Sequence, residues 1–163
     1  MSMKQIQGIQ LYSIVTVRVL LGWYFLYEGI VKLLTPNWSA FGFLKSSQGI
    51  FSSFFIDLAD KPIAVDVINQ LNIWGLIAIG LGLILGALSR LASISGAVLV
   101  LLYYLSNPPF IGAQQLVYST EHTLWVDKNL IFVGILLIMY AFPTSHIIGV
   151  DRVLFNKKNE IDG

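Results

Sequence analysis

Three ionisable side chains inside an apolar stretch near the N-terminus have the greatest potential for chemistry in this sequence. They are Arg18, Glu28 and Lys32, within residues 11–34. In a helix, which turns about 100° per residue, Arg18 and Lys32 share one face and Glu28 lies at its edge. Glu28 precedes Lys32 by four residues, the favourable order for an ion pair. We expect either a polar pocket in which Glu28 handles protons, or a structural arrangement in which Arg18 and Lys32 extend towards opposite ends of the helix.

A second polar group precedes and begins the last apolar stretch of the chain. If the helix there extends backward, His122, Trp125 and Asn129 share one face, and His122 could relay protons because histidine titrates near neutral pH. The alternative is an interfacial cap, with a carboxylate at the helix N-terminus and a tryptophan at the membrane surface. The members of this group are Glu121, His122, Trp125, Asp127, Lys128 and Asn129.

The composition indicates that a membrane surrounds these groups. Hydrophobic residues make up 56% of the 163 residues and charged residues only 12%, whereas soluble domains carry about 25% charged residues. Residues 67–89, 91–120 and 129–150 contain no Asp, Glu, Lys or Arg. Each run exceeds the roughly 20 residues that cross a bilayer as a helix. The net charge of +1 argues against a nucleic-acid-binding protein.

The predicted fold is therefore an all-α bundle of four transmembrane helices in one domain. We expect the helices at about residues 11–34, 67–88, 91–107 and 127–142. Residues 37–66 are too polar to cross the membrane and predict one or two amphipathic helices at the interface. Residues 143–163 predict a polar, exposed C-terminal tail. A signal peptide is a poor description of residues 11–34, because the stretch is long, contains charges and has no small-residue cleavage site.

Four spans place both termini on one side of the membrane. That side carries six Lys and Arg residues against four on the other, which favours cytoplasmic termini. Both polar groups then lie towards the outer face, except Arg18. His122 and His146 fall at opposite faces, so they cannot share a haem, and no other residue spacing indicates a metal site.

Small residues predict how the second helix packs. Gly82 and Gly86 form a GxxxG pair, which lets a neighbouring backbone approach closely in lipid. They belong to a stripe that Ser93 and Gly96 of the third helix could face. We expect a packing surface inside the bundle, or alternatively a surface between two copies of the chain. The stripe consists of Gly75, Ala78, Gly82, Gly86 and Ser89.

Some chemistries have no support in the sequence. The chain contains no cysteine, which removes disulfides, thiolate metal sites and thiol redox chemistry. It also contains no nucleotide-binding glycine loop, no GxSxG and no HExxH motif.

Three segments resemble the DoxX/DoxD-like membrane proteins. The first helix is similar to the family's R-x-x-x-G…F-x-x-x-G-x-x-K-L opening, through Arg18, Gly22, Phe25, Gly29 and the Lys32-Leu33 pair. The other two are the segment from Trp38 to Leu44, with sequence WSAFGFL, and that from Trp125 to Leu130, with sequence WVDKNL. The resemblance covers most of residues 11–142.

This resemblance implies a four-helix bundle in the bacterial cytoplasmic membrane. For the best-known members it also implies the membrane subunit of a thiosulfate:quinone oxidoreductase, although most members have no established activity. A quinone is then the expected cofactor, held between the first and fourth helices near the outer face. Glu28 and His122 are the candidate catalytic residues. The candidate binding residues are Arg18, Lys32, Trp38, Glu121, Trp125, Lys128 and Asn129.

A non-catalytic role is the alternative. Relatives of the family include chaperone-like and cargo-handling membrane proteins. The aromatic residues of 37–66 would then dock a membrane or extracytoplasmic protein partner, or the bundle would bind a lipid.

Overall fold

The computed structural model describes residues 8–109 and 126–156, and every regular element in these ranges is a helix. This confirms the predicted all-α class. The four principal helices are α1 (Ile9–Leu34), α4 (Pro62–Leu85), α5 (Ser89–Ser106) and α6 (Lys128–Ala141). The short elements are α2 (Phe41–Lys45), α3 (Ser52–Ala59), the 3-10 helix η2 (Thr144–His146) and α7 (Val150–Asn156).

Three of these helices, α1, α4 and α5, are long and apolar enough to cross a membrane. The fourth, α6, has 14 residues and is about 21 Å long at 1.5 Å per residue. The chain is thus a membrane protein, with three full-length spans and one shorter apolar helix among the described residues. α4 begins at Pro62 rather than near residue 67, since proline is well accommodated in the first turn of a helix.

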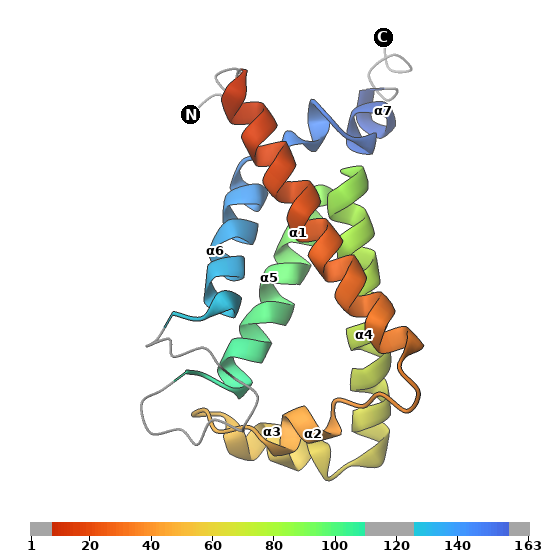
Figure 1. Cartoon of the computed structure of the whole chain (residues 1–163), viewed down its shortest axis with the longest axis vertical. Coiled ribbons are helices and arrows are strands. Elements are labelled where there is room, and N and C mark those ends of the chain that lie inside the picture. The colour runs from red at the N-terminus through yellow and green to blue at the C-terminus, as the bar shows by residue number, and fades with distance from the viewer. Residues whose placement is uncertain (1–7, 110–125, 157–163) are drawn as a thin grey trace.

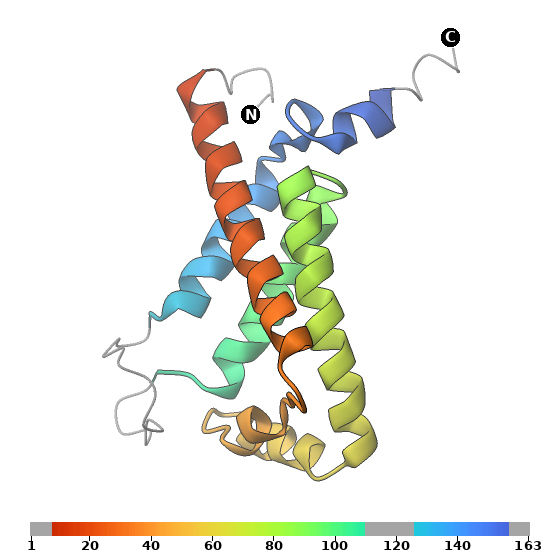
Figure 2. The same cartoon turned by 45° about the vertical axis from the view of Figure 1, so that its right-hand side comes forward.

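The bundle has two distinct ends, which Figures 1 and 2 show. α1 begins and α7 lies at one end, here called the terminal end. α2 and α3 lie across the other, here called the loop end. α1 packs mainly along α4, and α6 packs mainly along α5. The predicted interfacial helices between the first two spans are present as α2 and α3, but this segment is shorter than expected because α4 starts early.

Glycines bring α1 and α4 close together. A Cβ atom added at Gly80 would lie 2.5 Å from the backbone nitrogen of Leu26, and one at Gly22 would lie 3.0 Å from the carbonyl oxygen of Gly80. These contacts allow no larger residue without a shift of the backbone. Close helix packing of this kind replaces the hydrophobic driving force that lipid does not supply. Among the glycines of the four principal helices, the shortest contacts are therefore between α1 and α4.

The predicted stripe on α4 packs only in part as expected. Gly82 faces Ala92 of α5, at 3.0 Å from an added Cβ, whereas Gly75 has no atom within 4 Å of such a Cβ. Gly86 ends α4 with a positive φ of 64° and packs against Gly149. Gly82 and Gly86 thus contact other parts of their own chain, and an oligomer through them stays a prediction.

The prediction of an exposed tail after residue 142 is wrong for its first part. The side chains of Thr144, Ser145 and Asp151 are at most 3% exposed. They are buried because their hydrogen-bonding partners lie on α1 and at the turn between α4 and α5. The segment from η2 to α7 therefore covers the terminal end of the bundle (Figure 1).

Candidate functional site

The last turn of α1 carries a buried polar connection to two other helices. The Lys32 ammonium donates a hydrogen bond to the side-chain oxygen of Asn72 on α4, at 3.1 Å. The amide nitrogen of Asn72 in turn donates to the hydroxyl of Tyr103 on α5, at 2.5 Å. Asn72 is only 7% exposed. Side chains from three helices, α1, α4 and α5, are thus joined by hydrogen bonds near the loop end of the bundle.

Aromatic rings surround the Lys32 ammonium. Its nitrogen lies 5.2 Å from the ring centroid of Trp38 and 5.6 Å from that of Tyr103. Both distances are within the range of a cation–π interaction. The ring of Phe43 packs edge-on against Tyr103, with centroids 5.7 Å apart. We call Lys32, Trp38, Asn72 and Tyr103 the Lys32 cluster.

The loop that carries Trp38 is held in place by α4 and α5. The backbone nitrogen of Ala40 donates to the side-chain oxygen of Asn69 at 2.8 Å, and the hydroxyl of Ser47 donates to the carbonyl of Ser106 at 2.6 Å. Trp38 also packs on a small apolar core formed by Ala40, Leu44, Phe55 and Ala59. These contacts position Trp38 over the end of α1.

Glu28 lies at the margin of this cluster. Its carboxylate is 3.9 Å from the Lys32 nitrogen, and its side chain is 42% exposed against 16% for Lys32. The predicted pair four residues apart is therefore present. A partly exposed ion pair at this distance contributes little to stability. Because Glu28 is more exposed than Lys32, it lies between the buried Lys32 cluster and the outside of the bundle.

Arg18 belongs to a different site, at the terminal end. It lies on the buried face of α1 as predicted, but about 21 Å along the helix from Lys32, at 1.5 Å per residue. One guanidinium nitrogen donates to the hydroxyl of Thr144 at 3.0 Å and another to the carbonyl of Ile148 at 2.7 Å. With 3% exposure, Arg18 is enclosed by the C-terminal segment.

Asp151 completes the site around Arg18. Its carboxylate accepts hydrogen bonds from the backbone nitrogens of Leu88, at 2.7 Å, and Ser89, at 3.3 Å. Leu88 is the N-cap of α5 and has no side-chain cap of its own, so Asp151 supplies the carboxylate that this helix N-terminus favours. The arrangement is structural and fastens the C-terminal segment to the bundle.

At the start of α6 the predicted helix cap is present. Asp127 accepts a hydrogen bond from the backbone nitrogen of Leu130 at 2.9 Å and one from the side chain of Asn129 at 2.7 Å. Lys128 is exposed. The other predicted members of this group, Glu121, His122 and Trp125, lie outside the described residues.

The contacts of α1 differ from the expected site between the first and fourth helices. α1 meets α6 through aromatic rings, with Phe132 at 5.0 Å from Tyr24 and 6.4 Å from Phe25 between centroids. The polar contacts of Lys32 are instead with α4 and α5. The candidate site is therefore built by α1, α4, α5 and the loop after α1.

In a comparison with protein-family models, the DoxX model matches residues 13–106. This is more than half of the chain. The protein belongs to the DoxX family. No curated protein and no solved structure matches the chain. The DoxX match includes every member of the Lys32 cluster, whereas α6 and the C-terminal segment lie outside it.

Asn72 and Tyr103 of this DoxX protein were not among the site residues predicted from the sequence. Asn72 is one of the few polar residues within the uncharged run 67–89, and its position inside a predicted span is the signal that could have identified it. Tyr103 has no such signal, since tyrosine is common near membrane surfaces. Within residues 8–109 and 126–156, no three histidine, aspartate or glutamate side chains are grouped to hold a metal ion.

Proposed function

We propose that this DoxX-family protein is the quinone-binding membrane subunit of an oxidoreductase, and that the quinone headgroup binds at the Lys32 cluster. The observation that supports this proposal is the convergence of hydrogen-bond donors from three helices beside aromatic rings, near one end of a membrane bundle. Polar and charged groups inside a membrane bundle are costly, and those that are kept there often mark a ligand or proton site.

The side chains present fit a quinone headgroup, which is a flat ring with two carbonyl oxygens that accept hydrogen bonds. The Lys32 ammonium has three hydrogens, of which one is directed to Asn72. The Tyr103 hydroxyl accepts from Asn72 and keeps its own hydrogen for donation. The ring of Trp38 offers a flat apolar surface for stacking. Lys32 and Tyr103 would hold the carbonyl oxygens.

A bound quinone would accept two electrons and two protons. Because the chain contains no cysteine, no thiol of this protein passes electrons, and a partner subunit supplies them. Glu28 is the group of this chain that would carry protons to the site. Its carboxylate lies beside Lys32 and is partly exposed, so it stands between the Lys32 cluster and the outside of the bundle.

The proposal is tested by quinone binding to the purified protein in lipid nanodiscs. Lys32→Gln removes the ammonium but keeps a side chain of similar length, and we expect quinone affinity to fall at least about tenfold, since a charged hydrogen bond is lost. Lys45→Gln is the matched control at the same end of the bundle, where Lys45 forms an exposed ion pair with Asp60. Equal affinity of both variants for quinone would refute the proposal.

A second candidate function rests on the exposed aromatic surface at the loop end. There α2, α3 and the residues between them expose large apolar side chains, which suit a lipid surface or a partner protein. Mass spectrometry of the gently purified protein separates the two functions. A stoichiometric quinone or redox subunit favours the first, and an exported protein without a quinone favours the second. These side chains are Phe41, Phe43, Ile50, Phe51 and Phe54.

A further inference from the structure

The loop between α2 and α3 is attached to the end of α5 at the carbonyl oxygen of Ser106. Ser106 is the last residue of α5, and the last carbonyl groups of a helix have no partner within it. The Ser47 hydroxyl donates to this oxygen at 2.6 Å, and the backbone nitrogens of Gln48 and Gly49 donate to it at 3.1 and 3.3 Å. Three donors of the 47–49 loop are thus directed to one buried oxygen.

Position 49 of this loop has room only for glycine. A Cβ added there would overlap the carbonyl oxygen of Leu105 and would lie 3.0 Å from the Cδ atom of Pro108. A backbone oxygen and a proline ring cannot turn aside as the end of a flexible side chain can. Glycine is the residue that permits such a close approach of two backbones. Any side chain at position 49 would therefore push the 47–49 loop away from the end of α5.

On its other side, the same segment of the chain is fixed to α4. The backbone nitrogen of Ala40 donates to the side chain of Asn69 at 2.8 Å. Ile68 of α4 and Trp38 both pack on the small apolar core of α2 and α3. The segment from Trp38 to Gly49 therefore bridges α4 and α5 across the loop end, where Figures 1 and 2 show α2.

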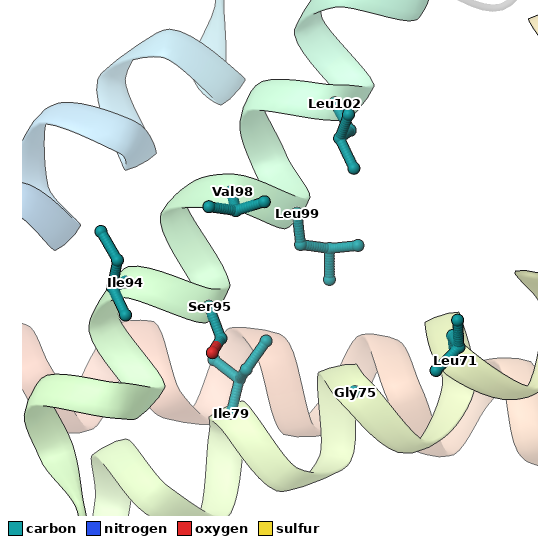
Figure 3. A pocket seen from close by; sticks show the side chains of 8 residues that line it. All are labelled: Leu71, Gly75, Ile79, Ile94, Ser95, Val98, Leu99 and Leu102. Carbon is teal, nitrogen blue, oxygen red and sulfur yellow. The ribbon is translucent and has the colours of Figure 1, made fainter.

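This bridge matters because α4 and α5 are separated over part of their length. A groove of about 360 Å³ lies between them, and Figure 3 shows that side chains of both helices border it. Gly75 provides no side chain there, and no atom lies within 4 Å of where its Cβ would be. Near the loop end of the groove, the hydrogen bond from Asn72 to Tyr103 joins the two helices. The 47–49 loop provides a second connection near that end.

The connection bears on the Lys32 cluster, because the two rings beside the ammonium belong to the two sides of the bridge. Trp38 is held on the α4 side, whereas Tyr103 lies on α5, three residues before Ser106. The ring of Phe43 on α2 packs against Tyr103. If the 47–49 loop moves away from the end of α5, Tyr103 is separated from Trp38. The Lys32 side chain, now 16% exposed, is then uncovered.

We infer that Gly49 is a positioning residue of the Lys32 cluster. It allows the 47–49 loop to lie against the end of α5, and this keeps the ring of Tyr103 beside the ammonium of Lys32. The importance of Gly49 for quinone binding rests on the proposed function, in which Lys32 and Tyr103 hold the carbonyl oxygens. The positions of the rings can be tested without a quinone.

The test measures how fast the N-hydroxysuccinimide ester of acetic acid acylates Lys32 in nanodiscs, with peptide mass spectrometry as the readout. Lys128, an exposed lysine on α6, is the internal reference. Menaquinone affinity is measured on the same samples. The main variant is Gly49→Ala. Its matched control is Gly42→Ala on α2, because a Cβ at Gly42 has no atom within 4 Å.

A second pair of variants makes a milder change at the same attachment. Ser47→Ala removes the 2.6 Å hydrogen bond to the Ser106 carbonyl. Ser46→Ala is its control, because the Ser46 hydroxyl donates within α2, to the carbonyl of Phe43. If Gly49→Ala does not fold, the comparison of Ser47→Ala with Ser46→Ala decides in the same way.

We expect Gly49→Ala to raise the acylation rate of Lys32 relative to Lys128 at least about threefold and to lower menaquinone affinity about tenfold, since a hydrogen bond to the ligand is lost. Ser47→Ala should act in the same direction, and both controls should match the wild type. A role of Gly49 in stability alone would leave the Lys32 rate of the folded protein unchanged.

Unchanged Lys32 rates in Gly49→Ala and Ser47→Ala would therefore overturn the inference. A raised rate with unchanged menaquinone affinity would overturn the role of Gly49 in ligand binding. If the rate rises but the wild type itself binds no quinone, the positioning role stands and the proposed function fails.

Discussion

Asn72 of α4 accepts a hydrogen bond from Lys32 of α1 while it donates one to Tyr103 of α5. One amide side chain therefore connects three helices near the loop end of the bundle. An amide is suited to this position because it has both an acceptor and a donor. The ammonium of Lys32 is held at a fixed place as a result, with the rings of Trp38 and Tyr103 around it.

Replacing this amide should weaken the bundle. Asn72→Leu has a similar volume but removes both hydrogen bonds, and we expect the free energy of unfolding to fall by about 1–2 kcal/mol. Thermal or denaturant unfolding in detergent measures the change. Tyr103→Phe, which removes one of the two bonds, should cost less. If Asn72→Leu were as stable as the wild type, the three-helix connection would not contribute to stability.

Glu28 should matter for turnover and little for binding. Glu28→Gln keeps the size of the side chain but removes its ability to carry protons. We expect quinone reduction by the complex with its redox partner to slow at least about a hundredfold, the usual effect of losing a general acid or base. Quinone affinity and thermal stability should change little. Asp57→Asn is the control, since Asp57 is an exposed carboxylate on α3. Equal rates in both variants would contradict the role of Glu28.

Acid should loosen the C-terminal segment through Asp151. Burial alone would raise the pKa of its carboxyl, but hydrogen bonds from Ser145, Leu88 and Ser89 and the charge of His146 outweigh burial and lower the pKa. A carboxyl with a lower pKa in the folded protein stabilises the fold above its unfolded-state pKa. This stability is lost as the pH falls from about 4 through the folded-state pKa. Amide hydrogen exchange of the segment from η2 to α7 measures it.

Asp151→Asn should expose this segment to exchange even at neutral pH and remove its part of the pH dependence. The matched control is again Asp57→Asn, which should exchange like the wild type. If acidification did not increase exchange between η2 and α7 in the wild type, the capping role of Asp151 would be wrong.

We propose that the terminal end faces the cytoplasm of a bacterial inner membrane, so that the Lys32 cluster lies near the outer face. The absence of cysteine makes this simple to test, since a single introduced cysteine is the only thiol. In intact cells, a reagent that does not cross the membrane should label Lys45→Cys on α2 and leave Arg152→Cys on α7 unlabelled. The reverse pattern would place the site on the cytoplasmic side.

The helices of this fold could be predicted from the sequence more accurately than the contacts between them. Long uncharged runs correctly indicated membrane-spanning helices. The charged residues of α1 correctly indicated that Arg18 lies on a buried face and that Glu28 pairs with Lys32. The spacing of residues along a helix shows which of its faces is buried, but it does not show which other helix packs on that face. The polar site was predicted between the first and last spans, whereas the polar contacts of Lys32 are with α4 and α5.

Long-range polar contacts explain the remaining errors. Thr144 and Asp151 belong to a polar segment and were expected to be exposed. Thr144 is buried because it accepts a hydrogen bond from Arg18, which is 126 residues away in the sequence. Asp151 is buried because its carboxylate accepts a hydrogen bond from the backbone nitrogen of Leu88 at the start of α5. Asn72 was not predicted for a similar reason, because its role depends on hydrogen bonds to Lys32 and Tyr103, which lie on two other helices.

The most direct test of the quinone site is photolabelling. A quinone with a photoreactive group on its ring is bound to the protein in nanodiscs, irradiated, and located by peptide mass spectrometry. We predict labelling of the peptides that contain Trp38 and Tyr103, competition by unlabelled quinone, and loss of the label in Lys32→Gln but not in Lys45→Gln. Labelling elsewhere on the protein, or labelling of these peptides that excess quinone does not reduce, would contradict a quinone site at the Lys32 cluster.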